Sequence, residues 1–102
     1  METLENAFNA LKGLGLVQTY RDFSTIWLQK SPSYFSMLRA SGRPASMDAL
    51  SHLIANLITR HELLKESRLG ELRHKADLMS PLLTEVWRDF RAAAGRVRVT
   101  SN

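Results

Sequence analysis

The chain has 102 residues, of which 44% are hydrophobic, so it can bury one modest core and we expect a single domain. It contains no cysteine, which excludes disulfide bonds and thiolate metal sites. Its formal net charge of +4 makes anionic partners worth considering. The acidic N-terminus lacks the features of a signal peptide, and no apolar run could span a membrane. We therefore expect a cytoplasmic protein with no membrane partner.

The first predicted helix covers about residues 4–11. Its apolar side chains recur at three- and four-residue spacing, and two glycines in residues 12–15 end it. Alternation typical of a strand occurs only at residues 97–100, too short and too terminal to form a sheet. The sequence therefore predicts an all-α fold, a compact bundle of about five to six helices.

Two short helices joined by a tight turn are predicted next. The first runs from about Thr19 to Gln29, with an apolar face formed by Tyr20, Phe23, Ile26 and Trp27. Within this helix, Thr25 stands where a small residue would let a second helix approach closely.

The second short helix is predicted to start at Ser31-Pro32 and to continue to about Ala40. Ser31 is a good N-cap, and Pro32 at the first helical position loses no intrahelical hydrogen bond. Gly42 can end the helix in the left-handed conformation.

After Pro44, Ser46 can cap a third helix. The apolar residues of this helix keep the helical period and must share a core with the helices before them. They are Met47, Leu50, Leu53, Ile54 and Leu57.

The residues from Trp27 to Leu38, from Gly42 to Ser46 and at Ala49-Leu50 together resemble the lambda-repressor-like (Cro/xenobiotic-response-element type) helix-turn-helix family. That family places a hydrophobic-Ser pair in its recognition helix, and Phe35-Ser36 matches it. Its loop from Gly to Pro-Ser and its following Leu- and Ile-bearing helix are matched as well. The resemblance covers about residues 8–58. Where the family usually has Gly and an apolar residue in the turn, this chain has Gln29-Lys30, which predicts a longer or differently shaped turn.

The resemblance implies a double-stranded DNA-binding transcriptional regulator, for instance a repressor, whose recognition helix at about Pro32–Ala40 lies in the major groove. Exposed residues of its first turns would then face base edges, and cations and a hydroxyl at its flanks would meet phosphates. The expected base contacts are Pro32, Ser33, Tyr34 and Met37, and the expected phosphate contacts are Arg21, Lys30, Ser31, Arg39 and Arg43.

Past Leu57, residues 59–77 mix both charge signs and predict a helix with a wide solvated face, in which Gly70 marks a break or a close contact. Ser80-Pro81 repeats the pattern of a capped helix start. A strongly apolar stripe follows and ends before Gly95. We accordingly divide the chain into a helix-turn-helix domain (1–58), a C-terminal helical extension (59–95) and a basic flexible tail (96–102).

The apolar stripe of this last helix has two interpretations. It folds back onto the core, or it pairs with a second copy, and we expect some of each, since such domains bind two half-sites as dimers. The candidate homodimer interface is Leu83, Val86, Trp87 and Phe90. The alternative is that these aromatic residues are ordinary core residues.

Charge leaves a second function open, because residues 1–57 hold five Lys and Arg against four Asp and Glu. A nearly neutral motif half also suits an adaptor or antiactivator that binds another regulatory protein. The basic tail could contact a DNA backbone or simply solubilise the chain.

Catalysis has little support in the sequence. The three histidines, His52, His61 and His74, do not form a metal motif, and no phosphate-binding glycine loop or nucleophile elbow is present. We therefore expect no enzyme activity, no metal and no cofactor.

Overall fold

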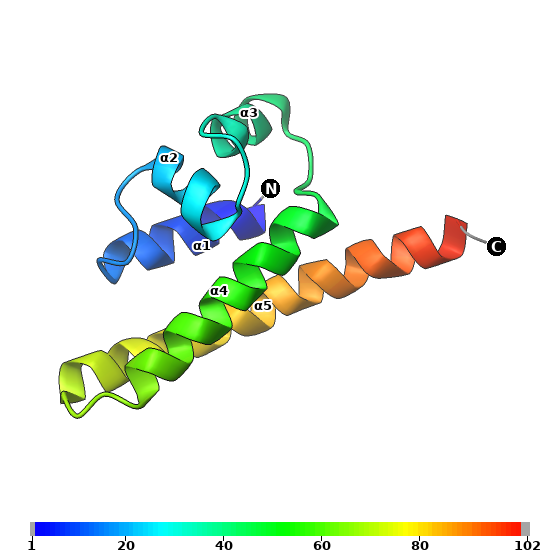
Figure 1. The fold of residues 1–102 in the computed structure, drawn as a ribbon. Coiled ribbons are helices and arrows are strands. Elements are labelled where there is room, and N and C mark those ends of the chain that lie inside the picture. Colours follow the sequence, from blue (N-terminus) through cyan, green and yellow to red (C-terminus); the bar gives the residue numbers. More distant parts are fainter. Residues whose placement is uncertain (1, 101–102) are drawn as a thin grey trace.

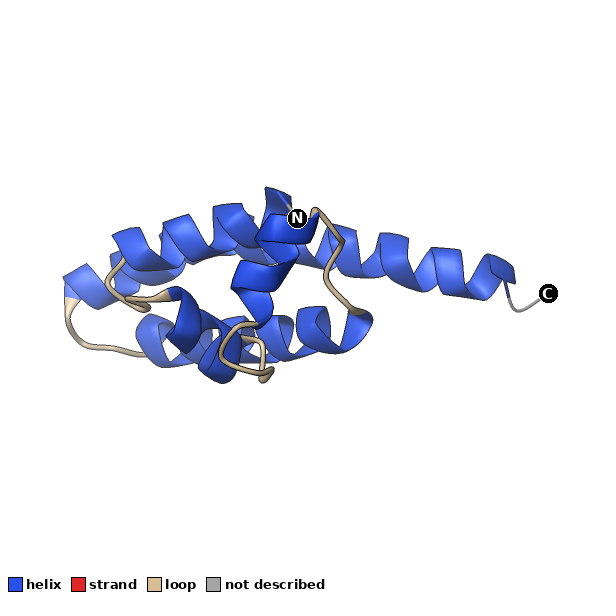
Figure 2. Cartoon of the chain, turned by 90° about the horizontal axis from the view of Figure 1, so that it is seen from above, coloured by secondary structure: helices blue, strands red, loops and turns tan. Residues whose placement is uncertain are grey.

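The computed structural model describes the backbone of residues 2–100 and the side chains of residues 3–95. Its helices in chain order are α1 (Glu2–Gly13), α2 (Tyr20–Asp22), the π-helical turn η1 (Phe23–Trp27), α3 (Tyr34–Ser41), α4 (Met47–Lys65) and α5 (Gly70–Thr100) (Figure 1). Residues 2–100 contain no strand (Figure 2). The predicted all-α fold is confirmed.

The two long helices, α4 and α5, lie side by side as a hairpin, and the four shorter segments gather along the upper part of it (Figure 1). Helix α1 packs on α5, and η1 packs on α4. The chain measures 49 × 28 × 18 Å, because the hairpin reaches beyond the short helices. No helix in residues 2–100 combines the length and the apolar character that a membrane span requires.

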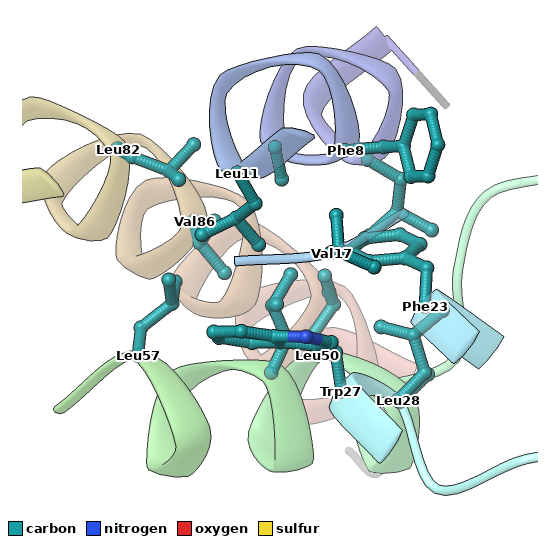
Figure 3. Close-up of a cluster of buried hydrophobic side chains, with 14 of the residues drawn as sticks. Phe8, Leu11, Val17, Phe23, Trp27, Leu28, Leu50, Leu57, Leu82 and Val86 are labelled. Carbon is teal, nitrogen blue, oxygen red and sulfur yellow. The ribbon is translucent and has the colours of Figure 1, made fainter. Parts of the chain in front are cut away.

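One apolar core joins all these helices. Trp27 is only 1% exposed and lies along α4, with Leu11 of α1 and Val86 of α5 facing it (Figure 3). The apolar positions predicted for the first helix, Leu4, Ala7, Phe8 and Leu11, are all buried in this core. The core therefore includes the C-terminal helix as well as the motif helices.

The helix that begins at Tyr20 is shorter than predicted. Thr19 caps it, since its hydroxyl accepts a hydrogen bond from the Asp22 N–H at 3.1 Å. The helix then widens into η1 and ends at Trp27, two residues before the predicted end at Gln29. This change of pitch turns Ile26 outward, so Ile26 is 51% exposed and its predicted place on the apolar face is wrong.

The predicted start of the next helix is also wrong. Helix α3 begins at Tyr34, with Ser33 at the cap position, because Ser31 to Tyr34 form a β-turn. The Tyr34 N–H donates to the backbone oxygen of Ser31 at 3.0 Å. Pro32 fits the second position of such a turn as well as it fits the start of a helix.

The end of α3 and the start of α4 agree with prediction. Gly42 has φ +69°, and its N–H bonds to the carbonyl of Leu38 at 2.8 Å. The Ser46 hydroxyl accepts from the Ala49 N–H at 3.1 Å and so caps α4.

The C-terminal half contains two continuous helices in place of the predicted pieces. Helix α4 continues past Leu57 to Lys65, and α5 begins at Gly70 and passes through Pro81 without a break. Pro81 deprives the carbonyl of Asp77 of a helical partner, but both residues are exposed, so water can satisfy that oxygen. The predicted helix start at Ser80-Pro81 is therefore wrong.

Helix α5 also continues through Gly95, the predicted end, as far as Thr100. The side chains of residues 96–100 and the whole of residues 101–102 lie outside the described part of the chain. The tail predicted there, including its flexibility and its arginines, falls on those residues.

Candidate nucleic-acid interface

Helix α3 is fixed in place by a buried serine. The Ser24 hydroxyl donates to the carbonyl of Tyr20 at 2.9 Å and accepts from the Phe35 N–H at 3.0 Å. The second bond satisfies an N–H in the first turn of α3 that has no partner within the helix. The neighbouring Thr25, which sequence spacing singled out, bonds only to the carbonyl of Arg21 in its own helix.

Aromatic side chains hold the buried side of α3. The ring centroid of Phe35 lies 4.9 Å from that of Phe23, 5.2 Å from that of Tyr20 and 5.7 Å from that of Phe8. The first two pairs have the edge-to-face geometry that aromatic rings prefer. Together with buried Leu38, these contacts hold α3 against α1, α2 and η1.

The turn before α3 depends on Gln29. Its φ is +53°, and it is the one non-glycine residue with positive φ in residues 2–100. The N–H of Lys30 then bonds to the carbonyl of Ser24 at 2.9 Å and closes the end of η1. Gln29 thus adopts the left-handed conformation that glycine usually provides at the end of a helix.

The solvent side of α3 carries mostly small, uncharged side chains, with Met37 and Arg39 as its larger members. Ser33, Ser36, Met37 and Ala40 are all exposed, and the Met37 side chain is 62% exposed. No Asp or Glu occurs between Asp22 and Asp48, whereas Lys30, Arg39 and Arg43 do. This acid-free stretch is visible in the sequence and gives residues 23–47 an excess of positive charge, which Glu5 and Asp48 from α1 and α4 partly offset in the structure.

Of the predicted base contacts, Pro32, Ser33 and Met37 are exposed, but Tyr34 is occupied. Its hydroxyl accepts from the Ser46 N–H at 3.1 Å, and its ring belongs to the edge of the core. Tyr34 therefore joins α3 to the start of α4, and Ser36 and Ala40, which were not predicted, complete the exposed face.

Two of the predicted phosphate contacts are already paired with carboxylates. The ammonium of Lys30 lies 2.6 Å from Asp48 Oδ2, and this hydrogen bond raises the pKa of Lys30 and lowers the pKa of Asp48. Arg39 lies 3.3 Å from Glu5 of α1, and its guanidinium stacks 4.8 Å from the ring of Tyr20.

The other three predicted phosphate contacts are Arg21, Ser31 and Arg43. All three are exposed, and within the described residues neither arginine is in an ion pair. Arg21 lies in α2, ahead of the turn, and Arg43 lies just beyond the C-terminal end of α3.

The four residues predicted at a dimer interface have unequal exposure. Val86 is fully buried in the core, so it cannot face a second copy, and that prediction is wrong. Leu83 and Phe90 are partly buried against the same core. Trp87 is 37% exposed, with its ring edge-to-face with Phe90 and the Arg91 guanidinium 5.9 Å from its centroid. Only Trp87 keeps substantial surface for a partner.

The histidines are spread along the hairpin. His52 lies 3.3 Å from Asp48 Oδ1, and His61 lies 3.3 Å from the Ser80 hydroxyl. No group of three or more His, Asp or Glu side chains in the described residues could hold a metal ion.

Comparison with known proteins gives a family but no relative of known activity. The family described as "Family of unknown function (DUF6626)" matches residues 4–98. The match extends from α1 almost to the end of α5. No curated protein and no solved structure matches the chain.

Proposed function

The chain belongs to this family of unknown function, and from its own residues we propose that it is a double-stranded DNA-binding transcriptional regulator. Helix α3 is its recognition helix and enters the major groove. A repressor that acts by occupying its site needs no ligand pocket, no metal and no cofactor, and it is the simplest form of such a regulator.

The observation that carries this proposal is the exposed face of α3. Side chains as small as Ser36 and Ala40 let the backbone of a helix come close to base edges, and Met37 can contact a thymine methyl group. Residues 23–47 themselves carry no carboxylate that would repel the phosphates beside the groove, and the two carboxylates that contact cations of this region, Glu5 and Asp48, come from α1 and α4. Direct readout is modest, since no arginine stands in the middle of the helix to read guanine.

Phosphate contacts fall mainly to Arg21 and Arg43, because Lys30 and Arg39 first have to leave their carboxylates. Such contacts position a protein on DNA without reading its sequence, and each one adds to the salt dependence of binding. Trp87 is the best remaining candidate for contact between two copies bound to a palindromic site.

The direct test is selection from a pool of random duplex DNA by the full chain at two salt concentrations, with the mass of the protein in solution recorded. Enrichment of a short site that weakens as salt rises supports a DNA-binding regulator. A palindromic site together with a doubled mass supports a dimer. Absence of binding even at low salt rules the proposal out.

We expect Arg43→Ala to weaken binding to all sequences and to reduce the slope of log affinity against log salt by about one, as for the loss of one phosphate contact. Fluorescence anisotropy across a salt series measures both effects. Arg68→Ala is the matched control, since Arg68 is an exposed arginine in the turn between α4 and α5. Equal effects of the two substitutions would mean that net charge, and not the α3 surface, controls binding.

A protein-binding adaptor is the second candidate, favoured by Ile26 and Met37, which expose apolar side chains on the short helices. The internal hydrogen bond of Tyr34 and the paired state of Lys30 also reduce what this surface offers to DNA. Two results together would support this candidate: the chain does not bind DNA, and it binds a regulatory protein in a way that Met37→Ser abolishes.

A further inference from the structure

Asp48 occupies an unusual position beside the exposed face of α3. It lies in the first turn of α4, and its two carboxylate oxygens contact two different side chains. Oδ2 lies 2.6 Å from the Lys30 ammonium, and Oδ1 lies 3.3 Å from Nε2 of His52. Asp48 is the first carboxylate in the chain after the acid-free stretch of residues 23–47.

We infer that Asp48 restrains DNA binding by this protein, because it holds Lys30 in an intramolecular ion pair and places a negative charge beside the α3 surface. This inference rests on the proposed function. It adds that the Asp48 carboxylate competes with DNA phosphates for the Lys30 ammonium at the same site.

The backbone holds Lys30 in the turn directly before α3, close to the face that would meet DNA. Its N–H is bonded to Ser24, and its ammonium lies 5.8 Å from the centroid of the Tyr34 ring, in the first turn of α3. The Tyr34 hydroxyl is bonded to Ser46, the cap of α4. The ammonium therefore lies between the starts of α3 and α4, where a cation could reach a phosphate beside the groove.

Electrostatics gives Asp48 two effects on a nearby phosphate. It repels the phosphate directly, and it occupies the one ammonium in the turn before α3, so binding through Lys30 first requires that the ion pair open. The charged or titratable side chains in contact around it are Lys30 from the turn and His52 from α4, with Tyr34 of α3 facing Lys30.

A structural role alone accounts poorly for Asp48. An acidic residue in the first turn favours a helix through the helix dipole. However, Ser46 already supplies the side-chain cap of α4, and the Asp48 side chain stays 60% exposed. Its loss should therefore cost little stability and change DNA affinity more.

The test compares Asp48→Asn with Glu62→Gln on a fluorescein-labelled duplex pool of random sequence, across a salt series. Glu62 is an exposed acid of the same helix, away from α3, so its substitution makes the same change in net charge. We expect Asp48→Asn to bind about five to ten times more tightly near 0.1 M salt, with a salt slope steeper by about one, as for one added phosphate contact. Glu62→Gln should change affinity less than twofold.

Lys30 variants test whether the gain in affinity of Asp48→Asn comes from the released Lys30 ammonium. Lys30→Ala alone should weaken binding, because it leaves the Asp48 charge unpaired beside the exposed face of α3, whereas Lys30→Ala in the Asp48→Asn background should remove the part of the gain that the freed ammonium supplies. Circular dichroism checks that every variant is folded.

The outcomes separate this inference from the proposed function. Wild-type chain that binds DNA, with Asp48→Asn no tighter than Glu62→Gln, overturns the inference and leaves the function standing. Binding by Asp48→Asn where wild type binds weakly or not at all supports the inference. Absence of binding by both at low salt overturns both.

Discussion

At the scale of single residues, Gln29 provides a direct test of the turn before α3. A side chain in the left-handed region costs about 1 kcal/mol, and glycine avoids that cost but loses more chain entropy on folding. We expect Gln29→Gly to stabilise the chain by about 0.5 kcal/mol in urea unfolding. Gln18→Gly is the control: Gln18 is exposed and has no positive φ, so glycine there should stabilise nothing. A destabilised Gln29→Gly would contradict the left-handed turn.

At this scale the sequence predicted two of the helix ends correctly, misplaced the caps at Ser31 and Ser80, and gave no sign of the internal contacts. Gly42 and Ser46 were correctly predicted because their roles depend on the backbone next to them. Ser24, Tyr34 and the two ion pairs were missed, since each joins residues 11 to 34 positions apart and depends on how the helices pack. A lone serine within an apolar helix face looks like a solvated position until its partner is known.

At the scale of helices, apolar spacing predicted where helices exist and failed at their boundaries. Helices α1 and α4 were found from their buried positions, whereas Pro32 and Pro81 were both taken as helix starts. Pro32 lies in a β-turn and Pro81 lies within α5. The φ angle that proline fixes suits a β-turn, the start of a helix and the interior of a helix alike. Only packing decides among them, and buried Met79, Leu82 and Val86 on either side of Pro81 keep α5 continuous.

Pro81 therefore gives a prediction about α5. Proline inside a helix costs about 3 kcal/mol relative to alanine, part of which has been relieved by exposure of the freed carbonyl. We expect Pro81→Ala to stabilise the chain by about 1–3 kcal/mol, with slightly higher helicity by circular dichroism. Arg88→Ala, on an exposed part of the same helix, should change stability by less than about 0.5 kcal/mol. Destabilisation by Pro81→Ala would mean that proline begins a separate helix, as the sequence suggests.

At the scale of the whole molecule, the motif helices (1–58) and the C-terminal helices (59–95) share a single core. Met79, Leu82 and Val86 of α5 belong to the same buried cluster as Phe23, Trp27 and the apolar side of α4. Helix α1, which begins the motif half, packs on α5. The N-terminal helices therefore depend on the hairpin for much of their burial, and we expect the chain to unfold as one unit.

The two tryptophans allow a test of this cooperativity. Trp27 is buried in the N-terminal half and Trp87 is partly exposed in the C-terminal half, so Trp87→Phe leaves Trp27 as a reporter of the motif helices alone. Circular dichroism reports mainly α4 and α5, the two longest helices. For a single cooperative unit, the urea midpoints from Trp27 fluorescence and from circular dichroism should coincide. Loss of the Trp27 signal at lower urea, with the helical signal retained, would mean that the α3 surface unfolds separately from the hairpin. In that case DNA binding would include the cost of ordering α3, and substitutions far from DNA, such as those in the core beside Trp27, would change affinity by changing the folded fraction.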